Sequence, residues 1–188
     1  MYPSGTASST LVLVPGLSDE LCGASRPGHF AGVTSVVCRL MNMCEPNIAV
    51  FGQKDYQQYV ILKRMVDDLH IPVRLLAGST QRDKNGLARS SRNGHLSKDD
   101  KARAAVIHSA LEAAADQLRH GNVAFEELEK TAAARIDAAG LETEYVSVRD
   151  AVDLSLPKPD TANLVVLAAA RLAHIRLIDN VLVAGVPG

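Results

Sequence analysis

A lysine and an aspartate follow a short apolar run, at a point where a strand would end and a helix would begin. The run Ile48 to Phe51 predicts the strand, and Gly52 ends it. Apolar residues with helical spacing follow, at Leu62, Met65, Val66 and Leu69. Backbone N–H groups at such a helix start favour an anion, so we interpret Lys54 as a phosphate contact. Asp55 is interpreted as a helix cap, or as a partner for Lys54 or a metal; a solvated Lys-Asp pair is the alternative.

Two loops carry further side chains that could bind an anion. The run LARSSRNGHLS places the hydroxyls of Ser90 and Ser91 beside the guanidinium of Arg92, whose planar fork can donate two bonds to phosphate oxygens. An earlier glycine-rich loop holds Arg26 and His29, a composition that suits either substrate binding or an ordinary turn. Neither loop is specific by itself, because many exposed loops contain the same residue types.

Apolar spacing predicts alternating strands and helices in the first half of the chain. Strands are predicted at residues 11–14, 48–51 and 71–76, and a polar loop follows at 77–86. A helix is predicted at residues 32–44. Its buried face would consist of Val33, Val36, Val37 and Leu40. The order of elements indicates an α/β domain with a parallel sheet.

The second half of the chain has a different pattern of elements. One Ala-rich helix is predicted from a cap at Ser97 to about Arg119, and a second at residues 125–139, ended by Gly140. Three strands follow, at residues 145–149, 163–170 and 176–183. Two helices and three strands predict a small α+β domain. We place the boundary so that residues 1–88 and 89–188 form two domains.

Composition is that of an ordinary globular protein. Hydrophobic residues make up 47% and charged residues 22% of the chain, and the formal net charge is -1. This balance favours neither disorder nor nucleic-acid binding, and no apolar run has membrane-spanning length. Cys22, Cys38 and Cys44 lack C-x-x-C spacing, so we expect buried free thiols and a cytoplasmic location. The scattered histidines lack the paired spacing of a metal site, and we expect no resident metal.

Four blocks occur in an order and spacing that resembles the pantothenate synthetase family: LCGASRPGHFAGV, FGQKDYQQ, GLARSSRN and RLIDN. The resemblance covers nearly the whole chain. It implies a partial Rossmann-like parallel-sheet domain of the nucleotidyltransferase superfamily, followed by an α+β domain with an antiparallel sheet. Only the second half of the family's nucleotide-binding domain is matched, so we expect a truncated form.

The resemblance also implies a reaction. The family joins pantoate to β-alanine with ATP, through pantoyl adenylate, and releases AMP and pyrophosphate. Because pantoate and the triphosphate are both anions, the site must supply positive charge and N–H donors, and Mg²⁺ bridging phosphate oxygens would share that task. The family's proteins are expected to be cytoplasmic homodimers without nucleic-acid or membrane partners.

Site residues follow from the same resemblance. Gly52, Gln53, Lys54 and Asp55 match the nucleotide-binding turn, with Lys54 at the phosphates and Asp55 near the ribose. Ser90, Ser91 and Arg92 match the mobile phosphate-binding loop, so these three and Lys54 are expected to act in catalysis. Pantoate would be bound by Gln58, with Val36 and Val37 against its gem-dimethyl group. Arg26 and His29 would bind substrate, brace the loop or contact a second subunit.

Several residues depart from the family pattern. The chain contains neither a P-T-M-G turn nor a His-x-Gly-His motif, whose histidines stabilise the adenylation transition state in the family. Gln81 stands where a valine usually lies by the adenine, and Arg89 where a methionine or leucine usually precedes the serines. The expected function is therefore pantothenate synthetase, with doubtful activity for these 188 residues alone. A catalytically inactive pantoate-binding, nucleotide-binding or dimerising remnant is the alternative.

Overall fold

The computed structural model describes residues 2, 5–7, 9–121 and 124–185 of the chain. Its internal contacts divide it into two compact units, Met1–Ser79 and Thr80–Gly188, which we call the first unit and the second unit and describe separately. The domain boundary that we place between residues 88 and 89 stays a prediction. Within the described ranges, no helix is long and apolar enough to cross a membrane.

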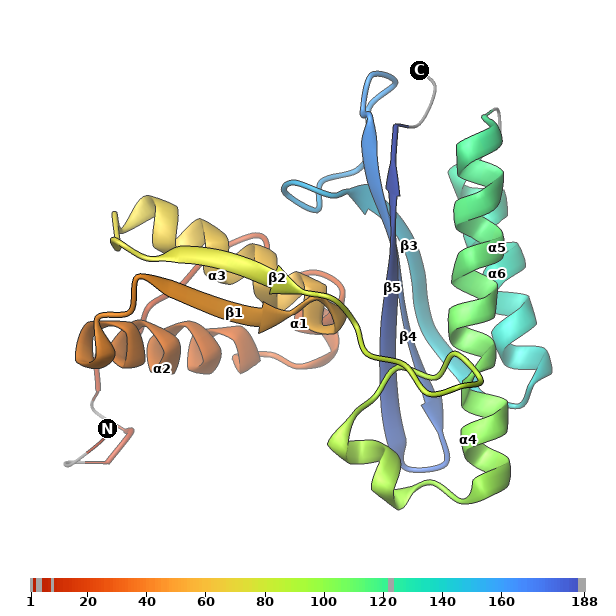
Figure 1. The fold of residues 1–188 in the computed structure, drawn as a ribbon, viewed down its shortest axis with the longest axis horizontal. Helices are drawn as coiled ribbons and strands as arrows, with labels where there is room; N and C mark the ends of the chain where they lie inside the picture. Colours follow the sequence, from red (N-terminus) through yellow and green to blue (C-terminus); the bar gives the residue numbers. More distant parts are fainter. Residues whose placement is uncertain (1, 3–4, 8, 122–123, 186–188) are drawn as a thin grey trace. The chain divides into compact units, whose positions relative to one another are not determined.

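The first unit contains a strand–helix–strand arrangement in which both strands run the same way (Figure 1). Strand β1 (Ile48–Gly52) leads into α3 (Tyr56–Asp68), and the chain returns as β2 (Arg74–Gly78). The strands pair in parallel, with Ile48 opposite Arg74 and Gly52 opposite Gly78. Such pairing requires a crossover, which the helix provides. The predicted parallel sheet is confirmed, although its second strand begins later than expected.

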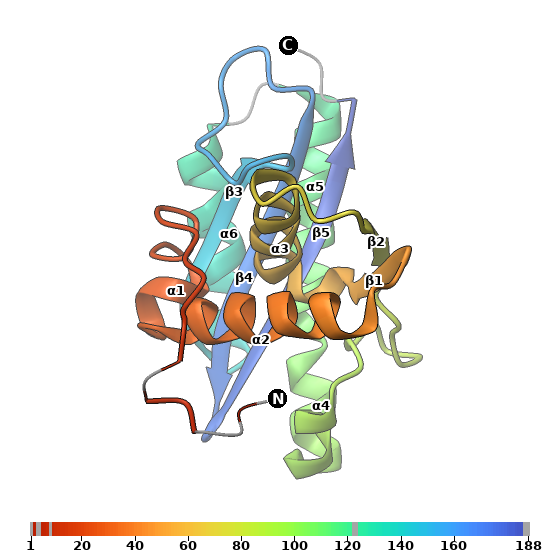
Figure 2. The same ribbon diagram turned by 90° about the vertical axis from the view of Figure 1, so that its left-hand side faces the viewer.

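Helix α2 (His29–Cys44) packs against α3 in the first unit, after the single turn α1 (Cys22–Ser25) (Figure 2). The face that we expected to be buried is not the buried one: Leu40 is 47% exposed, and the three valines do not form a continuous buried row. The buried residues of α2 are instead Phe30, Thr34, Ser35 and Met41. Thr34 and Ser35 turn inward because their hydroxyls hydrogen-bond backbone groups of Val12.

The expected strand at residues 11–14 is absent, and this prediction was wrong. The Ser35 hydroxyl accepts a hydrogen bond from the N–H of Val12 at 2.9 Å, and the Thr34 hydroxyl donates to the carbonyl of Val12 at 2.5 Å. Side chains of α2 therefore occupy the backbone groups that a neighbouring strand would need. The segment is held against the helix and not in a sheet.

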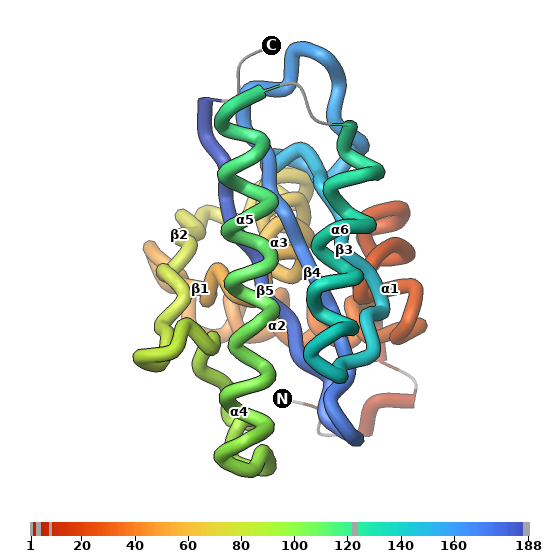
Figure 3. The backbone as a smooth tube through the Cα atoms, turned by 90° about the vertical axis from the view of Figure 1, so that its right-hand side faces the viewer, coloured from red at the N-terminus to blue at the C-terminus, as the bar shows by residue number. Residues whose placement is uncertain are grey.

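The second unit is an antiparallel sheet with helices on one face. Strand β4 (Asn163–Leu172) lies between β3 (Glu142–Asp150) and β5 (Ile175–Ala184). Helices α5 (Val106–His120) and α6 (Phe125–Ala138) lie side by side over the sheet (Figure 3). Their apolar faces meet alternate residues of the strands, so the hydrophobic core of this unit lies in this layer. The α+β prediction is confirmed.

The long helix expected after Ser97 is divided in two. The hydroxyl of Ser97 accepts a hydrogen bond from the N–H of Asp100, so the predicted cap of α4 (Lys98–Ala104) is confirmed. Ala105, where ψ is -17°, separates the two helices, and α5 begins at the next residue. At the end of α6, Gly140 has φ +77°, a value that favours glycine.

No disulfide joins the three cysteines, and their environments differ. Cys22 is buried, as expected, whereas Cys38 is half-buried and Cys44 is exposed. Cys44 is the last residue of α2, beyond the part of the helix that packs inward. The expectation of uniformly buried thiols was therefore wrong for Cys44.

Candidate functional site

The lysine turn lies at the carboxyl end of β1, where a parallel sheet presents its ligand-binding edge. Gly52 is the last residue of the strand, and a single 3-10 turn, η1 (Gln53–Asp55), connects it to α3. Lys54 is half-buried, and Asp55 is exposed. Asp55 stands at the N-cap position of α3, but its side chain makes no capping hydrogen bond. The carboxylate of Asp55 is thus not used as a cap.

Gly52 has open space where a side chain would be. A Cβ built on it would meet no atom within 4 Å, and its φ of -65° is accessible to any residue. Neither the local backbone nor the packing of the described residues therefore requires glycine here. A close approach of a ligand to the backbone is a common reason for glycine at such a position.

The adjacent glutamines of α3 have different environments. Gln57 is buried, and its amide makes three hydrogen bonds to α1 and the segment before it: its oxygen accepts from the N–H of Cys22, and its nitrogen donates to the carbonyls of Leu17 and Glu20. Gln58 is half-buried and makes no side-chain hydrogen bond to the described residues. The amide that could bind a ligand is therefore that of Gln58.

The glycine-rich loop holds its two candidate residues against each other. A guanidinium nitrogen of Arg26 lies 2.9 Å from Nε2 of His29, whose ring also lies against Phe30. This contact favours the loop-bracing interpretation. A cavity of about 270 Å³ lies nearby, and its lining includes Val14, Ser18 and Phe30 but neither Arg26 nor His29.

The second unit carries the Ser-Ser-Arg candidates on a short turn. Ser90 precedes the 3-10 helix η2 (Ser91–His95), and its hydroxyl accepts a hydrogen bond from the N–H of Arg92 at 3.3 Å. Ser91 and Arg92 are exposed, and the guanidinium of Arg92 makes no hydrogen bond or ion pair within the described ranges. Asn93 holds the turn to the preceding loop: it is buried, and its side-chain amide donates to the carbonyl of Ala88.

A small hairpin-like loop leads into this turn. Arg82 and Ala88 form an antiparallel bridge, and the N–H of Arg89 donates to the carbonyl of Gln81 at 2.8 Å. The side chain of Gln81 is exposed. The Arg89 side chain forms an exposed ion pair with Asp83 at 2.9 Å, so the unusual cation at this position has a partner in the same loop.

The candidates thus form two groups. Most of them belong to the first unit, and the segment from Gln81 to Arg92 belongs to the second. Within the first unit, Val36 and Val37 lie on α2, the helix that packs against the one carrying Gln58. The assignment of these residues to a ligand is a proposal.

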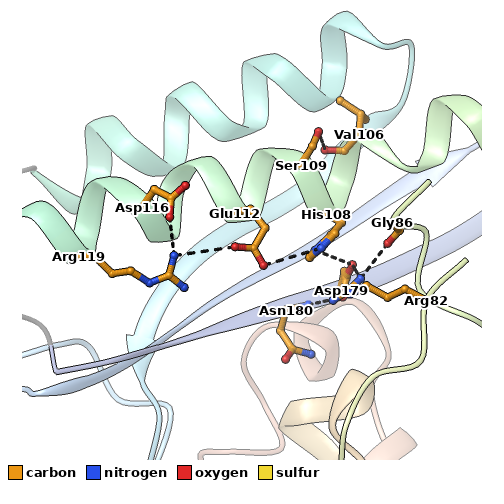
Figure 4. Close-up of polar contacts among 10 residues, drawn as sticks. All are labelled: Arg82, Gly86, Val106, His108, Ser109, Glu112, Asp116, Arg119, Asp179 and Asn180. Atoms are coloured by element: carbon orange, nitrogen blue, oxygen red, sulfur yellow. Dashed lines mark hydrogen bonds and ion pairs between the residues drawn. The ribbon is translucent and has the colours of Figure 1, made fainter. Parts of the chain in front are cut away.

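Sequence reasoning missed two residues that organise these groups. Gln57 follows helical spacing with the buried residues Val60 and Ile61, so its inward direction could have been inferred. Asp179 alternates with Leu177 and Val181 in β5, and a charged residue in such a row indicates a buried carboxylate. Asp179 is 5% exposed and binds Arg82 (Figure 4).

The comparison with protein families gives a match over almost the full sequence. The model for "Pantoate-beta-alanine ligase" matches residues 1–182. The chain belongs to this family. Ligation is the family's activity, and the resemblance that we draw from the four sequence blocks is confirmed.

Individual relatives agree with the family assignment. The pantothenate synthetase of Thioalkalivibrio sulfidiphilus is 52% identical over 180 residues, which are 96% of this chain and 63% of the relative. That of Ectopseudomonas mendocina is 46% identical over 183 residues, 97% of this chain and 64% of the relative. This chain therefore spans less than two thirds of the length of these relatives.

Solved structures of the family share the fold. The pantothenate synthetase of Thermus thermophilus superposes with a TM-score of 0.89 at 37% identity, over 96% of this chain and 65% of that one. A pantoate-beta-alanine ligase from Francisella tularensis, solved with beta-gamma ATP and beta-alanine, has a TM-score of 0.71 at 31% identity, over 96% of this chain and 60% of that one. The nucleotidyltransferase-type fold is confirmed.

Proposed function

We propose that this chain supplies phosphate-binding and pantoate-binding residues of a pantothenate synthetase, the ATP-dependent ligase that joins pantoate to β-alanine. The observation that carries the proposal is the family match over residues 1–182. Two features of the described chain support it: a lysine turn at the carboxyl end of a parallel strand, and an exposed arginine on a serine-rich turn. The ATP ligand of the Francisella tularensis relative also supports a nucleotide substrate.

The proposed reaction has two steps. A carboxylate oxygen of pantoate attacks the α-phosphorus of ATP, and the bond to the bridging oxygen breaks to release pyrophosphate. The amine of β-alanine then attacks the acyl carbon of pantoyl adenylate; AMP leaves with the electron pair of the broken acyl–oxygen bond, and the amine loses a proton. Both steps bring anions together or develop negative charge, so fixed cations and N–H donors would accelerate them.

The proposed roles follow from this charge requirement. Lys54 and Arg92 would bind phosphate oxygens, and the hydroxyls of Ser90 and Ser91 would donate to them. Gly52, Gln53 and Asp55 would line the nucleotide, and Gln81 and Arg89 its adenine edge. For pantoate, Gln58 would supply the amide, and Val36 and Val37 an apolar wall.

Mg²⁺ would enter with the nucleotide. The described residues contain no group of three or more His, Cys, Asp or Glu side chains arranged to hold a metal. Mg²⁺ typically keeps several waters and is held largely by substrate phosphates. MgATP is therefore the proposed substrate. We also propose assembly as a homodimer and a cytoplasmic location.

A second candidate function is a non-catalytic binding or dimerising protein. The 188 residues contain no His-x-Gly-His motif, so the difference between the two candidates is one of turnover. Loss of each such transition-state donor costs about 3 kcal/mol in comparable oxyanion sites, so the two candidates differ strongly in turnover. Both candidate functions predict ligand binding, because both assign Lys54, Gln58 and Arg92 to ligands.

Calorimetric titration of the 188-residue chain with MgATP and with pantoate tests the proposal. We expect binding of both ligands, with weaker MgATP binding in Lys54→Ala and Arg92→Ala. Lys63→Ala and Lys98→Ala are matched controls, because both lysines are exposed and lie outside the candidate groups. A wild-type chain that binds neither ligand would overturn the proposal. Pantoate-dependent exchange of pyrophosphate into ATP then separates ligase from binding protein.

A further inference from the structure

A carboxylate lies in the apolar layer between β5 and the helices of the second unit. It belongs to Asp179, which alternates along β5 with the buried residues Ile175, Leu177, Val181 and Val183. The side chain of Asp179 is only 4% exposed. Removing a carboxylate from water carries a large free-energy penalty unless the charge is paired and hydrogen-bonded.

Arg82 supplies that pairing from 97 residues away (Figure 4). Its Nη1 donates to Oδ2 of Asp179 at 2.6 Å, and its Nη2 donates to Oδ1 at 2.9 Å. The backbone N–H of Asn180 also donates to Oδ1, at 2.8 Å. The carboxylate is therefore satisfied by a two-bond fork and one backbone donor.

The same arginine closes the loop that precedes the Ser-Ser-Arg turn. Nη1 of Arg82 also donates to the carbonyl of Gly86 at 3.1 Å. Backbone bonds join Asp83 to Leu87 and Gln81 to Arg89, so the loop is tied at both its base and its tip. Ser90 follows directly. The orientation of the Ser90–Arg92 turn thus depends on a loop whose anchor is Asp179.

The ring of His108, on α5, packs against Gly86 of this loop. Its Nδ1 lies 3.9 Å from Oδ2 of Asp179, and its Nε2 lies 3.8 Å from Oε1 of Glu112. A Cβ at Gly86 would approach Cδ2 of the ring to 3.0 Å, and Gly86 has φ +91°. A side chain at position 86 would therefore crowd the ring of His108. This close packing leaves the loop little room to shift.

A buried ion pair is a poor device for stability, because apolar residues of similar volume often stabilise a fold equally well or better. The Arg82–Asp179 pair instead connects a polar loop to the main core of its unit. We propose that Arg82 and Asp179 are positioning residues that hold the Ser90–Arg92 turn in its phosphate-binding shape. This inference rests on the proposed function, because it assigns the turn to ATP.

The test replaces the pair by apolar residues, in the double variant Arg82→Met/Asp179→Leu. No unpaired charge remains, so the variant should melt cooperatively near the wild-type Tm. We expect amide hydrogen exchange at Arg89 and Asn93 to become about tenfold faster, while exchange in β4 is unchanged. The Kd for MgATP should rise by about tenfold or more, since small misplacements of a binding group are costly.

A matched control removes a different ion pair from the same sheet. In Arg176→Met/Glu144→Leu, two contacts of Glu144 are lost: the 2.7 Å pair between its Oε2 and Nε of Arg176, and the 2.8 Å pair between its Oε1 and Nε of Arg171. Neither contact involves a residue of the loop. Neither exchange at Arg89 and Asn93 nor the Kd for MgATP should change. Arg82→Lys keeps the charge without the two-bond fork and should give intermediate values, which also serves if the double variant does not fold.

The outcomes separate three cases. Unchanged exchange at Arg89 and Asn93 in the double variant would overturn the proposed anchoring. Faster exchange with an unchanged Kd for MgATP would overturn the positioning role in ATP binding. A wild-type chain without affinity for MgATP would overturn the proposed function itself, and the exchange rates would still decide whether the pair holds the turn.

Discussion

The side-chain oxygen of Gln57 accepts a hydrogen bond from the backbone N–H of Cys22 at 3.0 Å, across 35 residues of sequence. The nitrogen of the same amide donates to two carbonyls of the preceding segment, those of Leu17 and Glu20. One glutamine thus fixes the chain around the start of α1 to the start of α3. The next residue, Gln58, takes no part in this network and remains available to a ligand.

The first prediction contrasts these two glutamines. Gln57→Ala should lower the free energy of unfolding by about 1–3 kcal/mol, because it removes three hydrogen bonds of a buried amide to the backbone around α1. Gln58→Ala should leave that free energy within about 0.5 kcal/mol of wild type and weaken pantoate binding. Urea denaturation and calorimetric titration measure the two effects. Equal losses of stability in both variants would contradict the assignment.

The second prediction concerns the open space at Gly52. Gly52→Ala should change the free energy of unfolding by no more than about 0.5–1 kcal/mol, because the extended backbone there suits alanine and a Cβ meets no neighbouring atom. The Kd for MgATP should nevertheless rise, since the added methyl group would occupy space proposed for the nucleotide. Gly140→Ala is the contrasting variant: its φ of +77° makes alanine strained, so stability should fall without a change in nucleotide affinity. Tighter or unchanged MgATP binding in Gly52→Ala would exclude a close nucleotide approach.

The third prediction concerns the exposed apolar residues of β1. Ile48 is 48% and Val50 65% exposed, and in the described chain β1 pairs with a strand only on its β2 side. Exposed apolar strands with an open edge favour association, so the chain should self-associate in sedimentation experiments as its concentration rises. Ile48→Lys/Val50→Lys should reduce that association. Lys substitution at the exposed Val152 of the second unit is the control. A wild-type chain that stays monomeric at high concentration would refute this expectation.

Local sequence determined most of the secondary structure. Strands β3, β4 and β5 lie within a few residues of their expected positions, because apolar and β-branched runs bounded by turn residues have few alternatives. The ends of the helices follow from single residues: the hydroxyl of Ser97 caps α4, and Gly121 and Gly140 adopt positive φ values that other residues disfavour. Family membership also followed from sequence, since four separated blocks carry it.

Tertiary structure decided which groups face inward and which distant residues meet. Residues 11–14 have the apolar pattern of a strand, but hydroxyls of α2 take the backbone groups of Val12, and no local pattern encodes that contact. The pairing of Arg82 with Asp179 likewise joins segments 97 residues apart. A buried charge can be inferred from strand alternation, whereas its partner depends on how the chain folds back. The physical reason is that periodicity reports burial along one element, while hydrogen-bond partners depend on packing between elements.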